Sequence, residues 1–493
     1  MSWTFDDNMA RNLSSEHKKT DELPRWFIVG FSGHRHLSDP GKLRELLREV
    51  FKKVGYPDRR VACVASAACG GDTIFHEEAA RHSFPRFVLL PFDRDTFQKD
   101  FDTEQWTRAA ALIDSAIGCD VLSGELARSE AFLDAGVLTV DRCDLLVVCW
   151  HGQAATGGGG TADVVAYARE VGKPMAIIDD VSGNLTFERA DLLPGGDAVC
   201  VAAPIGDPLL IVQTEHRRQA DKAGKHGPRS RNLVLWLIWL HLGASAIAVV
   251  VVLAEVNEAW KWGASLAKLL ALCTAVVFMQ IQHRAKTSWI SSRLSTELCR
   301  SYLAIWKLRR SSSIVPDTEG MKLDSMAQSL RMLWYLDKDK QVTLSQAKEW
   351  YLRERIDNQR DYFQSSIARV APQYVWGRRI ALYGTVLTII SIALCQIIPH
   401  QLEAEWYYKL LKSMTMLLPL AGAAILSYLF ALDMGRRTIR YREMIDALIT
   451  AHKKVETAKT WPALLRVVAD TERKLLREIS EWHAVASYGG KSN

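Results

Sequence analysis

The chain has 493 residues, of which 48% are hydrophobic and 24% charged, with a formal net charge of +6. This length predicts two or three domains, and because much of the positive charge flanks apolar stretches, it does not indicate a nucleic-acid-binding protein. The nine cysteines form no CxxC pair, which argues against a metal site or a disulfide framework and favours small buried residues in a reducing cytosol.

Residues 1–24 are predicted to form an N-terminal tail. This stretch lacks the apolar core of a signal peptide. We therefore expect internal apolar stretches to direct membrane insertion and the N-terminal domain to stay in the cytoplasm.

Short apolar runs alternate with helical patterns between residues 25 and 205. Strands are predicted over 25–31, 60–66, 87–90, 144–150 and 174–178. Helices are predicted over 42–53, 73–82 and 162–171. The first run, RWFIVGF, is nearly continuous, as in a strand buried on both faces of a parallel sheet. The alternation predicts a doubly wound α/β domain.

Three of the predicted strands end in glycine-bearing turns, and ligands in this fold class bind beyond the carboxyl ends of the strands. Glycines let the backbone approach a phosphate, and the following helix offers free N–H groups. The turns predict a site for an anionic, nucleotide-derived ligand. Its predicted residues are Ser32, Gly33, His34, Arg35, Ser66, Gly70, Gly71, Asp72, Trp150, Gly152, Gly157, Gly158, Gly159, Gly160, Thr161 and Asp163.

Individual residues in these turns have more than one interpretation. Arg35 is suited to a bidentate clamp on phosphate. His34 and His36 are either catalytic or merely line a polar site. Asp72 and Asp163 lie near helix starts, where they either cap the helix or bind a ribose.

Four later stretches are apolar enough to cross a membrane, since about 20 apolar residues span the hydrocarbon core. They cover residues 233–253, 265–281, 380–398 and 414–432. A buried helix of a soluble protein is the alternative for any one of them. Because the four form two closely spaced pairs, we expect two membrane hairpins.

The charges that flank these stretches predict their orientation. Basic residues cluster before the first and third stretches and after the second and fourth, at Arg217, Arg218, Lys222, Lys225, Arg229, Arg231, Arg284, Lys286, Arg293, Arg378, Arg379, Arg436, Arg437, Arg440 and Arg442. The short connectors carry acidic and aromatic residues, at Glu255, Glu258, Trp260, Trp262, Glu403, Glu405, Trp406, Tyr407 and Tyr408. The positive-inside rule places both termini in the cytoplasm.

Helical periodicity continues outside the membrane stretches. It predicts helices over 282–307, 321–370, 441–459 and 462–482, with a break at 313–320 around Pro316. Each hairpin is thus followed by a basic amphipathic helix, which suggests a duplicated unit.

Three motifs resemble the SLOG superfamily over residues 25–180. They are FSGHR at 31–35, SAACGGDT at 66–73 and WHGQAATGGGGTADVVAYAREVGKP at 150–174. The resemblance implies a Rossmann-like nucleotide binder, either an enzyme that splits nucleoside monophosphates or a sensor. The membrane half resembles the SLATT type of two-helix effector, which accompanies SLOG domains in bacterial conflict systems and is thought to form pores.

The sequence departs from the enzymatic members of that family. Their glycine run is followed by an acidic residue three positions after the threonine, where this chain has Val164, one step from Asp163. Where many relatives have Trp-Asp-Gly, this chain has Trp150-His151-Gly152. We therefore expect nucleotide binding without catalytic residues and without a cofactor or metal.

The predicted domains are a tail (1–24), a SLOG-like domain (25–205), a basic linker (206–232), a first hairpin with its helix (233–310), a cytoplasmic helical segment (311–378), a second hairpin (379–432) and C-terminal cytoplasmic helices (433–493). We expect a homo-oligomeric effector in the bacterial inner membrane that forms a pore or disrupts the bilayer when a nucleotide second messenger binds. A membrane-anchored nucleotide hydrolase and an anchored scaffold are the alternatives. A transporter is less expected, because His241 is the chief polar residue inside the spans.

Overall fold

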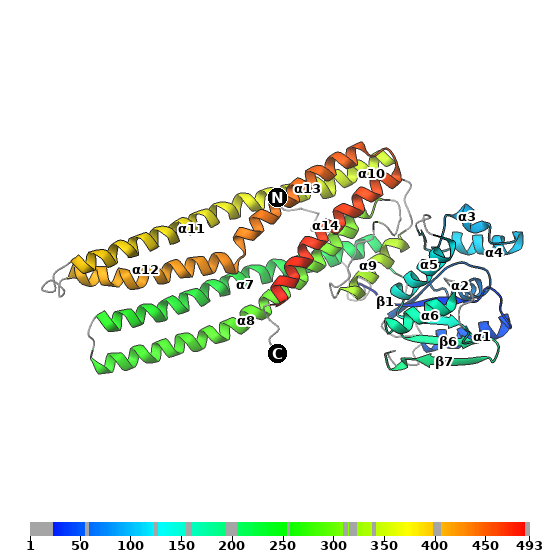
Figure 1. The fold of residues 1–493 in the computed structure, drawn as a ribbon, viewed down its shortest axis with the longest axis horizontal. Helices are drawn as coiled ribbons and strands as arrows, with labels where there is room; N and C mark the ends of the chain where they lie inside the picture. The colour runs from blue at the N-terminus through cyan, green and yellow to red at the C-terminus, as the bar shows by residue number, and fades with distance from the viewer. Residues whose placement is uncertain are drawn as a thin grey trace, which may run out of the picture. The chain divides into compact units, whose positions relative to one another are not determined.

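The computed structural model describes residues 23–54, 59–122, 127–153, 160–192, 205–253, 257–308, 314, 323–337, 342–397 and 406–488. The chain divides into two compact units. The first, here called the α/β unit, comprises Met1–Glu215 together with Ile305–Val342. The second, here called the membrane unit, comprises His216–Ala304 together with Thr343–Asn493 (Figure 1).

A seven-stranded sheet with the order β4-β3-β2-β1-β5-β6-β7 forms the centre of the α/β unit. The strands are β1 (Arg25–Gly33), β2 (Arg59–Ala65), β3 (Arg86–Leu90), β4 (Gly118–Val121), β5 (Leu145–Cys149), β6 (Met175–Asp179) and β7 (Asn184–Glu188). All neighbouring strands are parallel except β6 and β7. The predicted doubly wound, Rossmann-like class is confirmed, as are its five predicted strands. The short strands β4 and β7 were not predicted.

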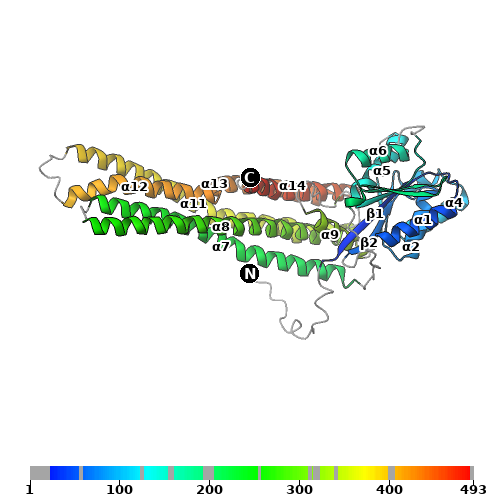
Figure 2. The ribbon, with the colours of Figure 1, turned by 90° about the horizontal axis from the view of Figure 1, so that it is seen from below.

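Helices cover both faces of this sheet, which is why β1 is apolar along most of its length. Helices α1 (Pro40–Lys53) and α2 (Gly71–Arg81) lie on one face, and α5 (Arg128–Arg142) and α6 (Thr161–Glu170) lie on the other (Figure 2). Two shorter helices, α3 (Arg94–Gln98) and α4 (Thr103–Asp114), precede β4, and the short 3-10 helix η2 (Ala190–Leu192) follows β7.

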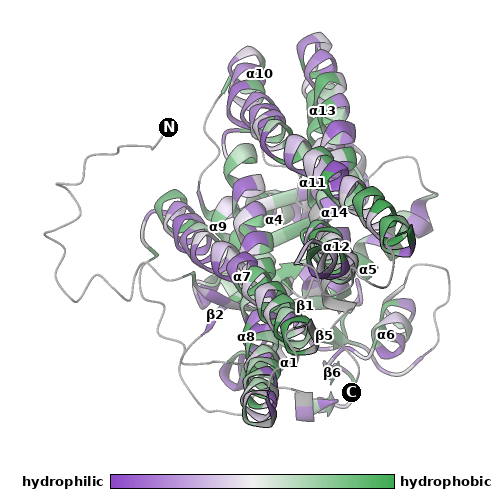
Figure 3. Ribbon diagram, turned by 90° about the vertical axis from the view of Figure 1, so that its left-hand side faces the viewer, coloured by the Kyte–Doolittle hydropathy of each residue, from purple (hydrophilic) through white to green (hydrophobic). Residues whose placement is uncertain are grey.

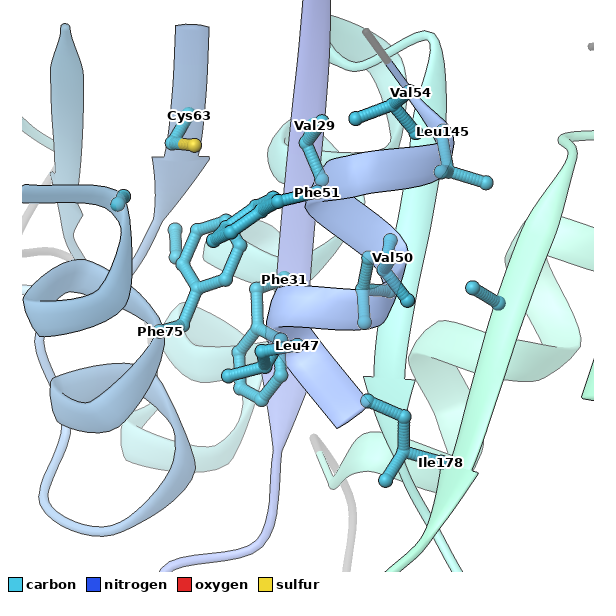
Figure 4. Packing of buried hydrophobic residues seen from close by; sticks show 14 of the residues in the cluster. Val29, Phe31, Leu47, Val50, Phe51, Val54, Cys63, Phe75, Leu145 and Ile178 are labelled. Carbon is cyan, nitrogen blue, oxygen red and sulfur yellow. The ribbon is translucent and has the colours of Figure 1, made fainter. Parts of the chain in front are cut away.

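Aromatic side chains pack together under α1 and α2 (Figure 4). The rings of Phe31 and Phe75 stack with centroids 4.9 Å apart, and Phe51 lies 5.8 Å from Phe75. Phe31 is the last apolar side chain of β1 before its glycine-bearing turn, so its packing in this core anchors the strand next to the turn. Truncating such a buried ring costs about 3–5 kcal/mol.

The α/β unit also holds a helix that follows the first hairpin in sequence, α9 (Asp324–Leu336). The Tyr335 hydroxyl donates to Asp120 Oδ1 at 2.9 Å, and Gln328 Nε2 donates to Asp144 Oδ2 at 2.9 Å. Asp120 lies in the short strand β4, which begins at Gly118, and Asp144 immediately precedes β5. Helix α9 therefore packs near the amino ends of these strands. The predicted segment 311–378 is therefore divided between the two units.

The membrane unit is entirely helical where the structure describes it. Its helices are α7 (Pro208–Leu253), which begins in the α/β unit, α8 (Glu258–Ile305), α10 (Leu344–Tyr351), the π-helix η4 (Leu352–Asp357), α11 (Asn358–Ile397), α12 (Trp406–Ala431), α13 (Met434–Thr457) and α14 (Trp461–Tyr488). The predicted cytoplasmic helices 441–459 and 462–482 correspond to α13 and α14. The predicted basic linker 206–232 is helical from Pro208 onward and continues into the first span.

The four predicted membrane stretches lie in α7, α8, α11 and α12. Each of these helices is long and apolar enough to cross a membrane, and only 6–17% of the most apolar part of each is buried within the protein. Figure 3 shows hydrophobic residues predominating in the parts of α11 and α12 nearest the viewer. Apolar surface on this scale indicates a lipid environment. Ile398, Glu255, Glu403, Glu405 and most of the predicted break at 313–320 lie outside the described residues.

A buried ion pair joins the helices beyond the spans. Arg355 of η4 donates to both carboxylate oxygens of Glu472 on α14, at 2.9 and 2.7 Å, and to Ser301 Oγ on α8 at 3.0 Å. Tyr351 donates to the same carboxylate at 2.8 Å. Removing one partner of such a buried pair costs about 3–5 kcal/mol, because the other charge is left uncompensated. The network therefore ties α8, η4 and α14 together.

Candidate functional site

A cleft of about 370 Å³ lies at the carboxyl ends of β1 and β2 and beside the start of α6, which follows β5. The sheet order reverses between β1 and β5, and ligands in open α/β sheets bind at such a switch point. The volume lies within the range of small-molecule sites. Eight of the predicted residues line this cleft: Ser32, Gly33, His34, Arg35, Ser66, Asp72, Gly160 and Thr161.

Gly70 and Gly71 hold two of the loops together. Gly70 has a φ of +90°, and a Cβ placed on it would lie 2.3 Å from the Arg35 carbonyl oxygen. The Gly71 N–H donates to the His34 carbonyl at 3.0 Å. The loop after β2 therefore packs directly on the loop after β1, which only a glycine at position 70 permits.

The charged groups of the cleft are Arg35 and Asp72. Burial raises the pKa of Asp72 from its ordinary 3.8 to about 7, and hydrogen bonds with the backbone of Ala68 and Gly33 and the charge of Arg35 counteract part of this shift. Arg35 lies over the Phe132 ring at 4.8 Å and 3.8 Å from Asp100, and its side chain is 40% exposed. A guanidinium at the cleft mouth can therefore reach an incoming anion.

Two further polar groups face the cleft with unused hydrogen-bonding capacity. His34 Nε2 and Ser66 Oγ are buried and have no hydrogen-bond partner within the described residues. Burial lowers the pKa of His34, as does the neighbouring His151, whose ring centroid is 4.5 Å away, whereas Asp180 opposes the shift. A neutral imidazole and a hydroxyl are suited to binding the polar edge of a base or sugar.

The start of α6 forms the third side of the cleft. Gly160 is the N-cap, and its N–H donates to Asp163 Oδ2 at 3.2 Å, so Asp163 caps the helix and is not among the cleft-lining residues. Val164 does line the cleft, and a Cβ on Gly136 would lie 2.3 Å from its Cγ2. Val164 thus forms an apolar contact between α5 and α6.

The remaining predicted residues lie elsewhere. The Trp150 indole donates to the Gln153 carbonyl at 2.8 Å and packs under Arg169. Gly152 has a φ of +83° and open space around it. Neither residue lines the cleft. Gly157, Gly158 and Gly159 lie outside the described residues.

Helix α5 forms a wall of the cleft that sequence reasoning missed. Its contribution consists of Phe132, Ala135, Gly136 and Thr139. The small residues Ala131, Ala135, Gly136 and Thr139 recur at helical spacing, and this periodicity could have indicated a helix in close contact with the sheet. In the part of the chain that the structure describes, no group of three or more His, Cys, Asp or Glu residues is placed to hold a metal ion.

Residues 351–482 match a protein family described as "SMODS and SLOG-associating 2TM effector domain 1", SLATT_1. The matched stretch covers the second hairpin and the helices on either side of it. Comparisons with curated proteins and with solved structures return no match. This part of the chain, which includes two of the four candidate spans, is therefore similar to two-span membrane effector domains of the SLATT type. The match does not reach the α/β unit, where the resemblance to SLOG domains remains a prediction.

Proposed function

We propose that this protein is a membrane effector of a bacterial antiphage or conflict system, and that a nucleotide-derived second messenger bound in the α/β unit controls it. The observation that carries the proposal is the convergence of turns far apart in the sequence on one cleft at the switch point of the sheet. The description of the matched family supports the association with a SLOG-type domain.

The cleft is suited to binding a phosphate-bearing ligand. Arg35 supplies a cation at its mouth, and the N-terminus of α6, which lines the cleft at Gly160 and Thr161, carries a partial positive charge. Asp72 is protonated over part of the physiological range, which lessens its repulsion of an anion. Val164 leaves the cleft without an acid at the position used by the related enzymes, which favours binding over hydrolysis.

Helix α5 offers a route from the cleft to the segments next to the membrane helices. Its middle lines the cleft, and its last residue, Arg142, donates to Asp120 Oδ2 at 2.7 Å. The other oxygen of Asp120 accepts from Tyr335 of α9. The chain connects α9 to α8 on one side and to α10 on the other, and this is the route that we propose from the cleft to both hairpins.

A ligand shifts such an equilibrium only by its difference in affinity for the two states. Converting a mostly closed population to a mostly open one requires about 5.5 kcal/mol of differential binding.

We propose that the protein lies in the inner membrane of a bacterial cell and that both of its termini are in the cytoplasm. Because four spans are too few to enclose a wide pore, the active form is a homo-oligomer.

The test uses the full chain in liposomes loaded with a fluorescent dye. A panel of mononucleotides, cyclic nucleotides and ADP-ribose derivatives is added, leakage is followed, and each nucleotide is then analysed by mass spectrometry. We expect one intact nucleotide to cause leakage in the wild type and in Arg94→Ala, whose side chain is similarly exposed, but not in Arg35→Ala. Leakage that is independent of nucleotides and of Arg35 would contradict the proposed sensing role.

One observation favours a second function, that of a membrane-anchored nucleotide hydrolase. Asp72 has a pKa of about 7 and lines the same cleft as His34. A carboxyl group with a pKa near neutrality is suited to general acid–base catalysis. Breakdown of a nucleotide without leakage, abolished by Asp72→Asn, would establish this function in place of the effector.

A further inference from the structure

The membrane unit contains a cavity of about 530 Å³, here called the basic pocket, at one end of its four spans. Its lining comes from residues 230–235, 282–293, 370–373 and 428–441, with one residue of α14. These segments precede the first span, follow the second, precede the third and follow the fourth. Because successive spans run in opposite directions, all four segments belong at one membrane surface. The basic pocket therefore lies at the level of the lipid headgroups.

The lining carries an excess of positive charge. Its six cations are Arg231, Lys286, Arg293, Arg436, Arg437 and Arg440, and its two acids are Asp433 and Glu478. Arg440 engages both acids, at 2.8 Å from Asp433 and 3.8 Å from Glu478.

Three of the other cations, Arg231, Lys286 and Arg436, make no ion pair with any described residue. Repulsion among cations that converge on one cavity opposes the packing of the four helix ends. An anion in the cavity would remove that repulsion.

Tyrosine hydroxyls fix part of the lining. Arg437 donates to the Tyr441 hydroxyl at 3.0 Å and lies over its ring at 5.1 Å. The Arg293 guanidinium is within 3.4 Å of the same hydroxyl. Two guanidinium groups are thus held in place on one tyrosine hydroxyl at the wall of the basic pocket. Guanidinium groups match the geometry of phosphate oxygens.

The basic pocket continues into apolar surface. Val234, Leu235 and Phe430 line it, and the side chain of Phe430 is 81% exposed. Because this surface lies in the bilayer, a phospholipid held by its headgroup in the basic pocket can extend an acyl chain along it, which a soluble phosphate compound cannot do. Basic pockets between membrane helices are known to bind anionic headgroups.

We propose that the basic pocket binds the phosphate headgroup of an anionic phospholipid, with an acyl chain along the apolar surface of α7 and α12. The bound lipid neutralises the cations where the four spans emerge from the bilayer. This inference rests on the membrane location of the helices and does not depend on nucleotide binding. It predicts that the packing of the helix ends depends on the lipid composition of the membrane.

The full chain, without nucleotide, is reconstituted in nanodiscs of phosphatidylcholine with or without phosphatidylglycerol. The protein is then released into detergent and analysed by native mass spectrometry for retained lipid. The test variant carries Arg231→Gln, Lys286→Gln and Arg436→Gln. The matched control carries Arg229→Gln, Arg284→Gln and Lys453→Gln, which removes the same charge from the same three helices outside the basic pocket.

We expect the wild type and the control to retain phosphatidylglycerol in preference to phosphatidylcholine. The fraction of protein that retains phosphatidylglycerol should be at least tenfold lower in the test variant. We also expect phosphatidylglycerol to raise the unfolding temperature of the wild type and the control only. Equal retention by the test variant and the control would overturn the proposal. A parallel sample in phosphatidylcholine receives inorganic phosphate, and retention of phosphate there without retention of phosphatidylglycerol would overturn the assignment to a lipid.

Discussion

The contact between Tyr335 and Asp120 provides a direct test of how firmly α9 is held in the α/β unit. Asp120 is 2% exposed, and its carboxylate accepts from the Tyr335 hydroxyl and from Arg142. Burial and the adjacent carboxylate raise the pKa of Tyr335 well above its ordinary value, so the hydroxyl stays a donor at every working pH. Tyr335→Phe removes this donor and keeps the ring, which packs edge-on against Phe87 with centroids 4.4 Å apart.

A hydrogen bond to a buried charged group contributes about 2 kcal/mol. Since about 1.4 kcal/mol corresponds to a factor of ten, Tyr335→Phe should raise the detached fraction of α9 by about thirtyfold. Amide hydrogen exchange of the full chain in detergent measures this fraction through peptides that cover residues 324–336. Asp120→Ala should have a larger effect, because it leaves both Arg142 and Tyr335 without their shared acceptor.

Tyr167→Phe is the matched control, because the Tyr167 hydroxyl donates to Asp141 at the surface of the same unit. Exposed pairs of this kind contribute about 0–1 kcal/mol, so the exchange of α9 should stay unchanged. Exchange in Tyr335→Phe within threefold of the wild type would show that α9 is held by other contacts, and the proposed route from cleft to membrane would lose its main link.

Three further predictions concern the cleft and are measured as nucleotide affinity of the full chain in nanodiscs. Arg35→Ala should weaken binding by about 10–100-fold, the loss expected for a charge-assisted contact to phosphate, whereas Arg94→Ala should not. Since the folded protein keeps the Asp72 proton up to a pKa of about 7, affinity for an anion should fall as pH rises from 6 to 8. Asp72→Asn has no carboxyl proton to lose, so it should make the fall in affinity between pH 6 and 8 smaller. A dependence of affinity on pH equal to that of the wild type would refute the assignment of this fall to Asp72. Gly70→Ala should lower stability by about 2 kcal/mol or more and abolish binding, because its Cβ would clash with the loop after β1 at a positive φ, whereas Gly206→Ala, in open space, should do neither.

Local patterns in the sequence were enough to predict much of the fold. The apolar run of β1 indicates a buried strand, and the glycines that follow β1 and β2 indicate tight turns. Each of these patterns lies within a few neighbouring residues. The four spans were equally predictable, because about 20 consecutive apolar residues have few alternatives outside a bilayer. The predicted cleft residues at 32–35, 66, 72 and 160–161 were found together for the same reason, since parallel strands end at one edge of a sheet.

Other features depend on contacts between residues far apart in the chain, which no local pattern encodes. The wall formed by α5 depends on how closely Gly136 lets it approach α6. The position of α9 depends on Tyr335 meeting Asp120 across 215 positions of sequence. The sequence by itself thus determined five of the seven strands, the four candidate spans and the strand ends at which the cleft lies. Only the tertiary structure decided which distant side chains complete the cleft and which helix packs at the amino ends of the strands, because close packing and buried hydrogen bonds are properties of the folded chain.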